Sequence, residues 1–275
     1  MLSNEDFEFI ARLLRDRSGL VVGADKGYLL DSRLMPVARK HGASSLKELV
    51  AALRASHDER MSRDVTEAMT TNESFFFRDI KPFDQFRDIV VPELLSSRAA
   101  RRSFRIWSAA CSSGQEAYSL AMILKEMGPR LAGWNIEIVG TDISTEMLRK
   151  AAAGTYTQFE VQRGLPIQMM VKHFKKHDEH WQISQEIRSM VQFREFNLLH
   201  DLRPLGQFDV VFCRNVLIYF DQETKSKVLD AISRQMPDDG ILYLGGAESV
   251  LGTSGAFRSM PEQRGVYRVT ARKAA

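Results

Sequence analysis

The sequence predicts an α/β fold in which a doubly wound, mainly parallel sheet follows a small all-helical domain. Three observations predict it. The first seventy of the 275 residues show only helical periodicity. From about residue 102 onward, β-rich apolar runs alternate with helical segments. The turn after the first of these runs consists of small residues, as at the ligand sites of such sheets.

The amino-terminal part predicts four helices. Ser3 is placed to cap the first helix and Gly19 to end it. The second and fourth helices follow the same periodicity, and Ser45 with Glu48 three positions later predicts a capping box for the third. We therefore expect a helical domain over residues 1–70.

The rest of the chain predicts strands, each followed by a turn and usually by a helix. The β-rich runs are FRIWSAA, WNIEIVGTD, FDVVFCRNV and GILYLGG. The last run, RGVYRVT, alternates and predicts an antiparallel edge strand. HWQIS and IRSMVQF predict the strands of a small antiparallel β-subdomain inserted at about 176–194, with a long loop as the alternative. We expect a linker over residues 71–85 and the sheet domain over residues 86–275.

Composition excludes several classes of protein. The 44% hydrophobic and 27% charged content is that of a globular chain, and a formal net charge of +3 is too small for a nucleic-acid binder. Cys111 and Cys213 stand apart without a metal-binding spacing, which is typical of reduced thiols, and we expect no metal. The amino end lacks signal-peptide features, and no apolar run approaches the roughly 18 residues of a membrane span. We expect a cytoplasmic protein without membrane insertion and, by default, a monomer.

The clearest ligand signal follows the first strand. SAACSSGQEAYS enters a helix through small residues and lacks both GxGxxG and Gly-Lys-Ser/Thr, which disfavours a dinucleotide or P-loop site. Glu116, in the first turn of that helix, could meet a cationic amine. Asp142, after the second strand, could accept hydrogen bonds from ribose hydroxyls. Together they favour S-adenosylmethionine as ligand. The structural alternatives are a first-turn charge for Glu116 and a helix N-cap region for Asp142.

Five stretches carry a resemblance to a known family. They are TTNESFFFRD, IWSAACSSGQEAYSLAM, GTDIS, FDVVFCRNVLIYF and LGGAESV. Through them the chain resembles the CheR-like chemotaxis receptor glutamate O-methyltransferases over nearly its whole length. The resemblance implies a Rossmann-like S-adenosylmethionine-dependent methyltransferase sheet. It also implies methyl transfer to glutamate side chains of chemoreceptors, which gives glutamyl methyl esters and S-adenosylhomocysteine.

The resemblance also implies site residues. Glu116 would hold the methionyl amine and Asp142 the ribose, while Arg78 and Tyr219 would be the catalytic residues. Ser74 stands where the family usually has threonine. The full cofactor-binding set that the resemblance implies is Asn72, Ser74, Arg78, Glu116, Asp142, Asn197, Leu198, Cys213, Arg214 and Asn215.

The proposed chemistry requires positioning more than activation. A glutamate carboxylate, with a pKa of about 4.3, is already an ionised nucleophile at pH 7. It needs no general base, in agreement with the absence of a Ser/His/Asp or Cys/His arrangement near the motifs. Arg78 and Tyr219 are the candidates for positioning it, with an ion pair to Asp79 or Asp84 as the structural alternative for Arg78. The alternative functions are a methyltransferase with another substrate and a non-catalytic S-adenosylmethionine-binding regulator.

The sequence contains two basic clusters that could be surfaces for binding a partner. The second helix carries Lys26, Arg33, Arg39 and Lys40, which the resemblance implies would dock on the acidic helical methylation region of a receptor; a solvated basic face is the alternative. The segment KKHDEHWQIS is short and lacks glycine, so we do not expect it to tether a receptor's carboxyl-terminal pentapeptide. We expect a solvated loop for the second cluster, Arg98, Arg101, Arg102 and Arg105.

Overall fold

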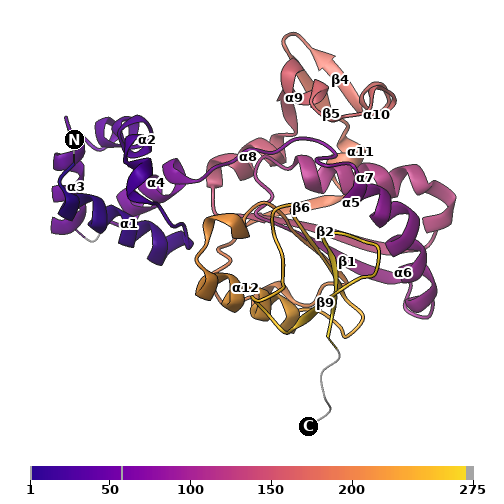
Figure 1. Ribbon diagram of the computed structural model, residues 1–275. Helices are drawn as coiled ribbons and strands as arrows, with labels where there is room; N and C mark the ends of the chain where they lie inside the picture. The colour runs from indigo at the N-terminus through magenta and orange to yellow at the C-terminus, as the bar shows by residue number, and fades with distance from the viewer. Residues whose placement is uncertain (1, 57, 271–275) are drawn as a thin grey trace. The chain divides into compact units, whose positions relative to one another are not determined.

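The computed structural model describes residues 2–56 and 58–270 (Figure 1). Residues 1, 57 and 271–275, which belong to the predicted domains, lie outside the described residues. The chain divides into two compact units. The first is Met1–Thr71 with Tyr219–Lys225, and the second is Asn72–Ile218 with Ser226–Ala275.

The first unit is helical, as predicted. Its elements are α1 (Asn4–Ser18), the 3₁₀ turn η1 (Ala24–Lys26), α2 (Gly27–Lys40), α3 (Leu46–Ala55) and α4 (Glu59–Met69). The Ser3 side chain caps α1, and Gly19, with φ +77°, ends it. The Ser45 hydroxyl accepts the Glu48 N–H at 3.2 Å, but the Glu48 carboxylate accepts the N–H of Ser44 at 2.7 Å, so the predicted capping box does not close on Ser45. The helices enclose an aliphatic core.

The basic cluster of α2 is smaller than the sequence predicts. The Arg33 guanidinium donates to the carbonyls of Met69 and Thr70 at 2.8 and 3.0 Å, where α4 ends and its last carbonyls lack helical partners. Lys40 and His41 both lie within ion-pair distance of Asp64, at 2.8 and 2.7 Å. Lys26 and Arg39 are exposed and remain available as a basic surface.

The second unit contains the sheets. Its helices are α5 (Lys81–Gln85), the π-helical turn η2 (Phe86–Val90), α6 (Val91–Ser97), α7 (Gln115–Met127), η3 (Gly128–Leu131), α8 (Thr145–Ala153), α9 (Gln158–Gln162), α10 (Ile167–His173), α11 (Gln185–Arg188) and η4 (Arg203–Leu205). The elements η5 (Leu217–Tyr219) and α12 (Gln222–Arg234) cross the boundary between the units. The strands are β1 (Ser103–Ala109), β2 (Asn135–Asp142), β3 (Thr155–Thr157), β4 (Phe174–His177), β5 (His180–Ile183), β6 (Val191–Glu195), β7 (Val210–Cys213), β8 (Ile241–Leu244), β9 (Phe257–Ser259) and β10 (Val266–Val269).

The main sheet confirms the predicted α/β class. Seven strands lie in the order β6-β2-β1-β7-β8-β10-β9, and the first five are parallel. The chain proceeds outward from β1 to β2 and from β7 to β8, so the strand order switches direction between β1 and β7. Helices α6 and α7 lie over one face and α12 over the other (Figure 1). Ligands in such sheets bind at this switch point, beyond the carboxyl ends of the strands.

The last strand differs from its prediction in one respect. As predicted, β10 pairs antiparallel, with Val266 opposite Tyr243 of β8. The edge position is taken instead by β9, which pairs with the outer side of β10. A strand of three residues is too short for alternation to reveal it.

A second, three-stranded antiparallel sheet has the order β3-β5-β4 and stands apart from the main sheet (Figure 1). The HWQI run forms β5, as predicted, but the prediction for IRSMVQF was wrong. Val191–Glu195 is β6 and pairs in parallel with β2 in the main sheet. The subdomain strands therefore lie within 155–183 rather than 176–194. Alternation indicates a half-buried strand but does not specify which sheet it joins.

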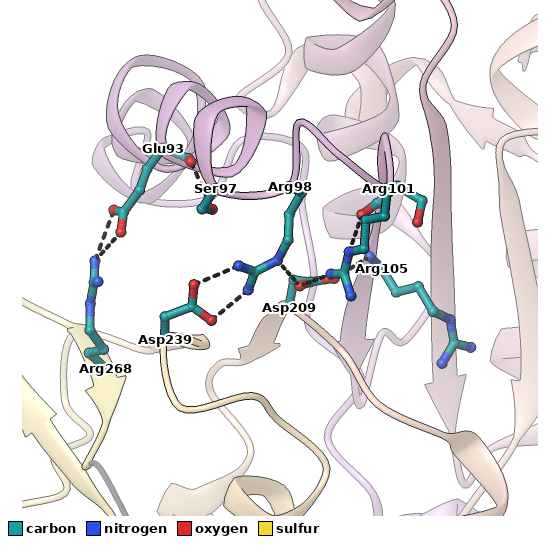
Figure 2. A network of polar contacts seen from close by, with 9 residues as sticks. Glu93, Ser97, Arg98, Arg101, Arg105, Asp209, Asp239 and Arg268 are labelled. Atoms are coloured by element: carbon teal, nitrogen blue, oxygen red, sulfur yellow. Dashed lines mark hydrogen bonds and ion pairs between the residues drawn. The ribbon is translucent and has the colours of Figure 1, made fainter.

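The amino ends of β1, β7 and β8 are held by a network of ion pairs, the amino-edge clamp (Figure 2). One Asp209 carboxylate oxygen accepts from Arg98 at 2.8 Å and from Arg101 at 2.5 Å, and the other accepts the Arg105 N–H at 2.9 Å. Arg98 also donates twice to Asp239. The expected solvated loop is therefore wrong for three of its four arginines, whose acidic partners lie more than 100 residues away or in the neighbouring strand.

No helix within 2–56 or 58–270 is both long and apolar enough to cross a membrane. Within the same ranges, His, Cys, Asp and Glu side chains form no group of three or more that could hold a metal ion.

Candidate active site

The turn that follows β1 is built from left-handed backbone. Ala110, Ser112 and Gly114 have φ values of +53°, +50° and +90°. Gly114 is the N-cap of α7, and a Cβ there would lie 2.9 Å from the Cβ of Ala151. The Ser112 N–H donates to Asp142 Oδ2 at 2.7 Å, and its hydroxyl donates to the Asn72 carbonyl at 2.8 Å. Non-glycine residues in this conformation cost energy and cluster at functional sites, so the surroundings must hold the turn in place.

Asp142 has the position that the sequence predicts, at the carboxyl end of β2, and only 6% of it is exposed. Its Oδ1 accepts the Ser144 N–H at 2.9 Å, and the Ser144 side chain caps α8. The N-cap alternative thus describes part of what Asp142 does. The Asp142 carbonyl accepts the N–H of Phe196 at 2.9 Å, which brings the following residues, Asn197 and the buried Leu198, to the same edge of the sheet.

Glu116 lies in a series of charges that we call the Glu116–Arg214–Asp79 chain, in which the Arg214 and Glu116 side chains are 1% and 13% exposed and that of Asp79 is 52% exposed. The Ser108 hydroxyl donates to Glu116 Oε1 at 2.8 Å, and Arg214 Nη1 donates to Glu116 Oε2 at 2.9 Å. Arg214 Nη2 donates to Asp79 at 2.6 Å and to the Arg78 carbonyl at 3.0 Å. The Glu116–Arg214–Asp79 chain therefore joins β1, α7, the residue after β7 and the linker.

Glu116 and Arg214 have the charges that could hold the amino-acid part of S-adenosylmethionine. The Arg214 side chain is 1% exposed, and among the described residues its Nε–H has no acceptor. A buried guanidinium donor without a partner is costly, and a carboxylate is the kind of acceptor that a guanidinium binds most strongly. The neighbouring Glu116 carboxylate is suited to an ammonium group. An acceptor and a donor side by side match the two charged groups of a methionyl moiety.

Arg78 is held by the linker itself. Its Nη1 donates to the Glu73 carbonyl at 3.0 Å, and its guanidinium lies 5.4 Å from the centre of the Phe75 ring. The alternative ion pairs are wrong, because Asp79 pairs with Arg214 and Asp84 with Arg87. Like the turn after β1, this segment contains left-handed non-glycine residues, at Phe77, Asp79 and Ile80.

The loop after β7 is organised by Glu248, to which the sequence assigns no role. Its Oε2 accepts the N–H groups of Asn215 and Gly245 at 2.8 and 2.7 Å. Its Oε1 accepts those of Val216 and Ile218 at 3.0 and 3.2 Å. One carboxylate thus fixes the loop in which Asn215 has a φ of +60°. The available signal is an acidic residue shortly after the two glycines that follow β8.

The remaining predicted residues are placed as follows. Asn72 and Ser74 line a pocket of about 450 Å³ together with Phe75, Ser113, Met147, Lys150, Phe159 and Arg163 among others. Cys213 is fully buried at the end of β7, and burial raises the pKa of its thiol well above the ordinary value. Tyr219 belongs to the first unit, where its carbonyl accepts the Val21 N–H at 2.9 Å. The other predicted residues lie in the second unit, at or beside the carboxyl edge of its sheet.

Comparisons with known proteins identify the family of the chain. Residues 5–70 match the family model described as the CheR methyltransferase all-alpha domain, and residues 72–266 match the CheR methyltransferase SAM binding domain. The chain is 42% identical over 254 residues to Chemotaxis protein methyltransferase 1 of Pseudomonas aeruginosa, covering 90% of this chain and 91% of that protein. It is 37% identical over 259 residues to the Chemotaxis protein methyltransferase of Vibrio parahaemolyticus, covering 93% of each.

These matches confirm the predicted family, the methyltransferase fold and S-adenosylmethionine as the cofactor. The chain belongs to the CheR methyltransferase family.

Proposed function

We propose that this chain transfers the methyl group of S-adenosylmethionine to glutamate side chains in the helical methylation region of chemoreceptors. The products are a glutamyl methyl ester and S-adenosylhomocysteine. The observation that carries the proposal is the Glu116–Arg214–Asp79 chain, because its buried Arg214 Nε–H, which has no acceptor within residues 2–56 and 58–270, belongs to a guanidinium that pairs with the Glu116 carboxylate. The names of the two relatives, both chemotaxis protein methyltransferases, support the class of substrate.

In this proposal the second unit holds the cofactor at the carboxyl ends of its strands. Glu116 accepts from the methionyl amine, Arg214 donates to its carboxylate, and Asp142 accepts from the ribose hydroxyls. The segments that pack around these three residues complete the site. They contribute Asn72 and Ser74 from the linker, Asn197 and Leu198 beside the adenine, and Cys213 and Asn215 after β7.

The chemistry follows from the charge states of the groups concerned. S-adenosylmethionine supplies an electrophilic methyl group bound to a positively charged sulfur. The acceptor glutamate is ionised at neutral pH and attacks without a general base. Burial raises the pKa of both Cys111 and Cys213, so these thiols are protonated and do not compete as nucleophiles. Arg78 and Tyr219 orient the carboxylate, which lowers the barrier by placing the reacting atoms in line.

The proposed docking surface for the receptor consists of two exposed basic residues, Lys26 at the end of η1 and Arg39 of α2. Arg33 and Lys40 contribute less than the sequence predicts, because each already has partners within the helical unit. Placement in the cytoplasm follows from the substrate, since the methylation region of such receptors is cytoplasmic. We propose a monomer that binds neither nucleic acid nor a pentapeptide tether.

A methyl-transfer assay tests the proposal. The full chain is incubated with tritium-labelled S-adenosylmethionine and the cytoplasmic fragment of a chemoreceptor, and the product is then treated with alkali. Only a carboxyl methyl ester releases volatile methanol. Label that stays on the product after alkali would indicate a different acceptor group. Binding of the cofactor without any transfer would indicate a regulator instead of an enzyme.

A further inference from the structure

Arg163, the residue at which α9 ends, contacts the linker that carries Arg78. Its Nη2 donates to Glu73 Oε1 at 2.5 Å, and its guanidinium lies 4.3 Å from the centre of the Phe75 ring. Arg78 uses the same two linker residues, through the Glu73 carbonyl at 3.0 Å and the Phe75 ring at 5.4 Å. Phe75 and Glu73 therefore stand between the two arginines and contact both.

The next residue, Gly164, lies in the loop that follows α9, and its backbone packs against the backbone of the linker. Gly164 has a φ of +83°, and a Cβ on it would lie 2.1 Å from the Phe76 carbonyl oxygen. No side chain fits at that distance, so the approach of the two backbones requires glycine here. The contact is thus a close backbone fit, with the Arg163 side chain lying alongside.

Helix α9, which precedes Arg163, is held in place by its own contacts. Thr157 and Glu160 form a capping box at the start of α9. Glu160 also pairs with Lys150 of α8 at 2.5 Å, and Gln158 accepts from the Trp181 indole of β5 at 2.7 Å. The loop is therefore anchored to the methyltransferase sheet through α8 and to the small subdomain through β5.

The ion pair between Arg163 and Glu73 contributes little to folding stability, because it is half-exposed at the wall of the pocket lined by both residues. The exposed fractions of the two side chains are 40% and 52%, and such pairs are screened by water. The Arg163 guanidinium lowers the pKa of the Glu73 carboxyl, with a smaller effect from the charge of Arg78, so the pair is formed at neutral pH. The contacts of Arg163 with Glu73 and Phe75 hold the linker in place.

We propose that Arg163 is a positioning residue for methyl transfer. It holds Glu73 and Phe75 in the geometry that presents Arg78 to the substrate carboxylate, and so couples the small subdomain to the reacting centre. This rests on the proposed role of Arg78. It assigns no contact with the substrate to Arg163 itself.

A double-mutant cycle tests this directly, with Arg163→Ala, Arg78→Ala and the double variant of the full chain. We expect Arg163→Ala to lower kcat for the receptor fragment by about tenfold, since displacements of about 1 Å have effects of this size or larger. KM for the fragment should change by less than threefold. In the Arg78→Ala background the same substitution should have almost no effect, because residues that act through one another are not additive. Arg149→Ala, an exposed arginine of α8, is the matched control and should retain normal turnover.

Two further variants keep the test decisive if Arg163→Ala folds poorly. Glu73→Gln removes the negative charge of the ion pair with Arg163 but leaves the backbone carbonyl of residue 73, which accepts from Arg78. It should therefore reproduce the loss of kcat. Arg163→Lys retains the charge but not the planar contact with Phe75 and should restore only part of the rate.

Each other outcome overturns the proposal. Equal effects of Arg163→Ala in the two backgrounds would mean that Arg163 acts independently of Arg78. A raised KM with unchanged kcat would mean that Arg163 binds the receptor itself. Normal turnover of both Arg163→Ala and Glu73→Gln would show that the contact has no role. If Arg78→Ala itself has normal turnover, the role of Arg78 in the proposed function fails first, which separates the two ideas.

Discussion

The two ends of the same parallel strands are built in opposite ways. At the amino ends, Asp209 is 5% exposed and each of its carboxylate oxygens accepts at least one hydrogen bond within the amino-edge clamp (Figure 2). At the carboxyl ends, Arg214 is equally buried but one of its donors has no protein acceptor among the described residues. Three left-handed non-glycine residues, Ala110, Ser112 and Asn215, lie at this end, compared with Arg102 directly before β1 at the amino end.

This difference indicates how the sheet separates stability from chemistry. Charged groups that are fully paired within the protein hold the strands and α6 together. They have no unpaired donor or acceptor with which to bind a ligand. A strained turn and an incompletely paired guanidinium lower the stability of the unliganded protein. A ligand that binds the folded state can offset this loss of stability. Substitutions at the two ends should therefore change different measured quantities.

The largest effect is expected at the amino-edge clamp. Asp209→Ala leaves Arg98, Arg101 and the Arg105 N–H without their shared acceptor, and should lower the free energy of unfolding by about 3 kcal/mol. Urea unfolding measures this, and turnover at 20 °C should stay normal. The exposed Arg102→Ala is the control and should change stability by less than about 0.5 kcal/mol. A loss of turnover at unchanged stability would contradict the separation.

The next effect is expected at the cofactor. Asp142→Ala removes the proposed ribose acceptor and the acceptor of the Ser112 N–H, and should raise the Kd for S-adenosylhomocysteine about 100-fold, as expected for hydrogen bonds to a charged group. Isothermal titration calorimetry checks this, with Glu146→Ala, on the exposed side of α8, as the control. Unaltered affinity would argue against the ribose role.

A smaller effect is expected on the chemical step. Arg78→Ala or Tyr219→Phe should lower kcat at least about tenfold while the fold stays intact, because each removes a group proposed to orient the carboxylate. Release of volatile methanol measures kcat, and circular dichroism checks the fold. Normal turnover by a folded variant would defeat the assignment for that residue.

The smallest effect concerns pH. The hydrogen bonds from Arg98 hold the pKa of Asp239 below its ordinary value of 3.8. A carboxyl with a lowered folded-state pKa stabilises the protein above its unfolded-state pKa and loses this contribution as pH falls through the folded value. Asp239→Asn should therefore be less stable than the unsubstituted protein at pH 7, with a difference that shrinks below pH 3.8. Urea unfolding measures the difference, and Asp238→Asn, at the exposed neighbour, is the control, which should change the free energy of unfolding at pH 7 by less than about 0.5 kcal/mol.

The sequence by itself determined the elements whose signals are local. The caps of α1, the periodicity of the helical domain and the order of strands and helices follow from residues a few positions apart, because burial imposes periods of 3.6 and 2 on each segment. The turn at Ser112 and the acid at Asp142 were visible for the same reason, since one lies in the turn after a strand and the other at the carboxyl end of a strand.

Only the tertiary structure decided which segments meet. It placed Val191–Glu195 in the main sheet, gave Asp209 to arginines more than 100 residues away, and brought Glu248 to four N–H groups and Arg163 to Glu73. The partner of a buried charge is set by chain topology rather than by neighbouring residues, and the cost of leaving that charge unpaired is what selects the partner. Local patterns cannot report such pairs, because they contain no information about which distant segment comes into contact.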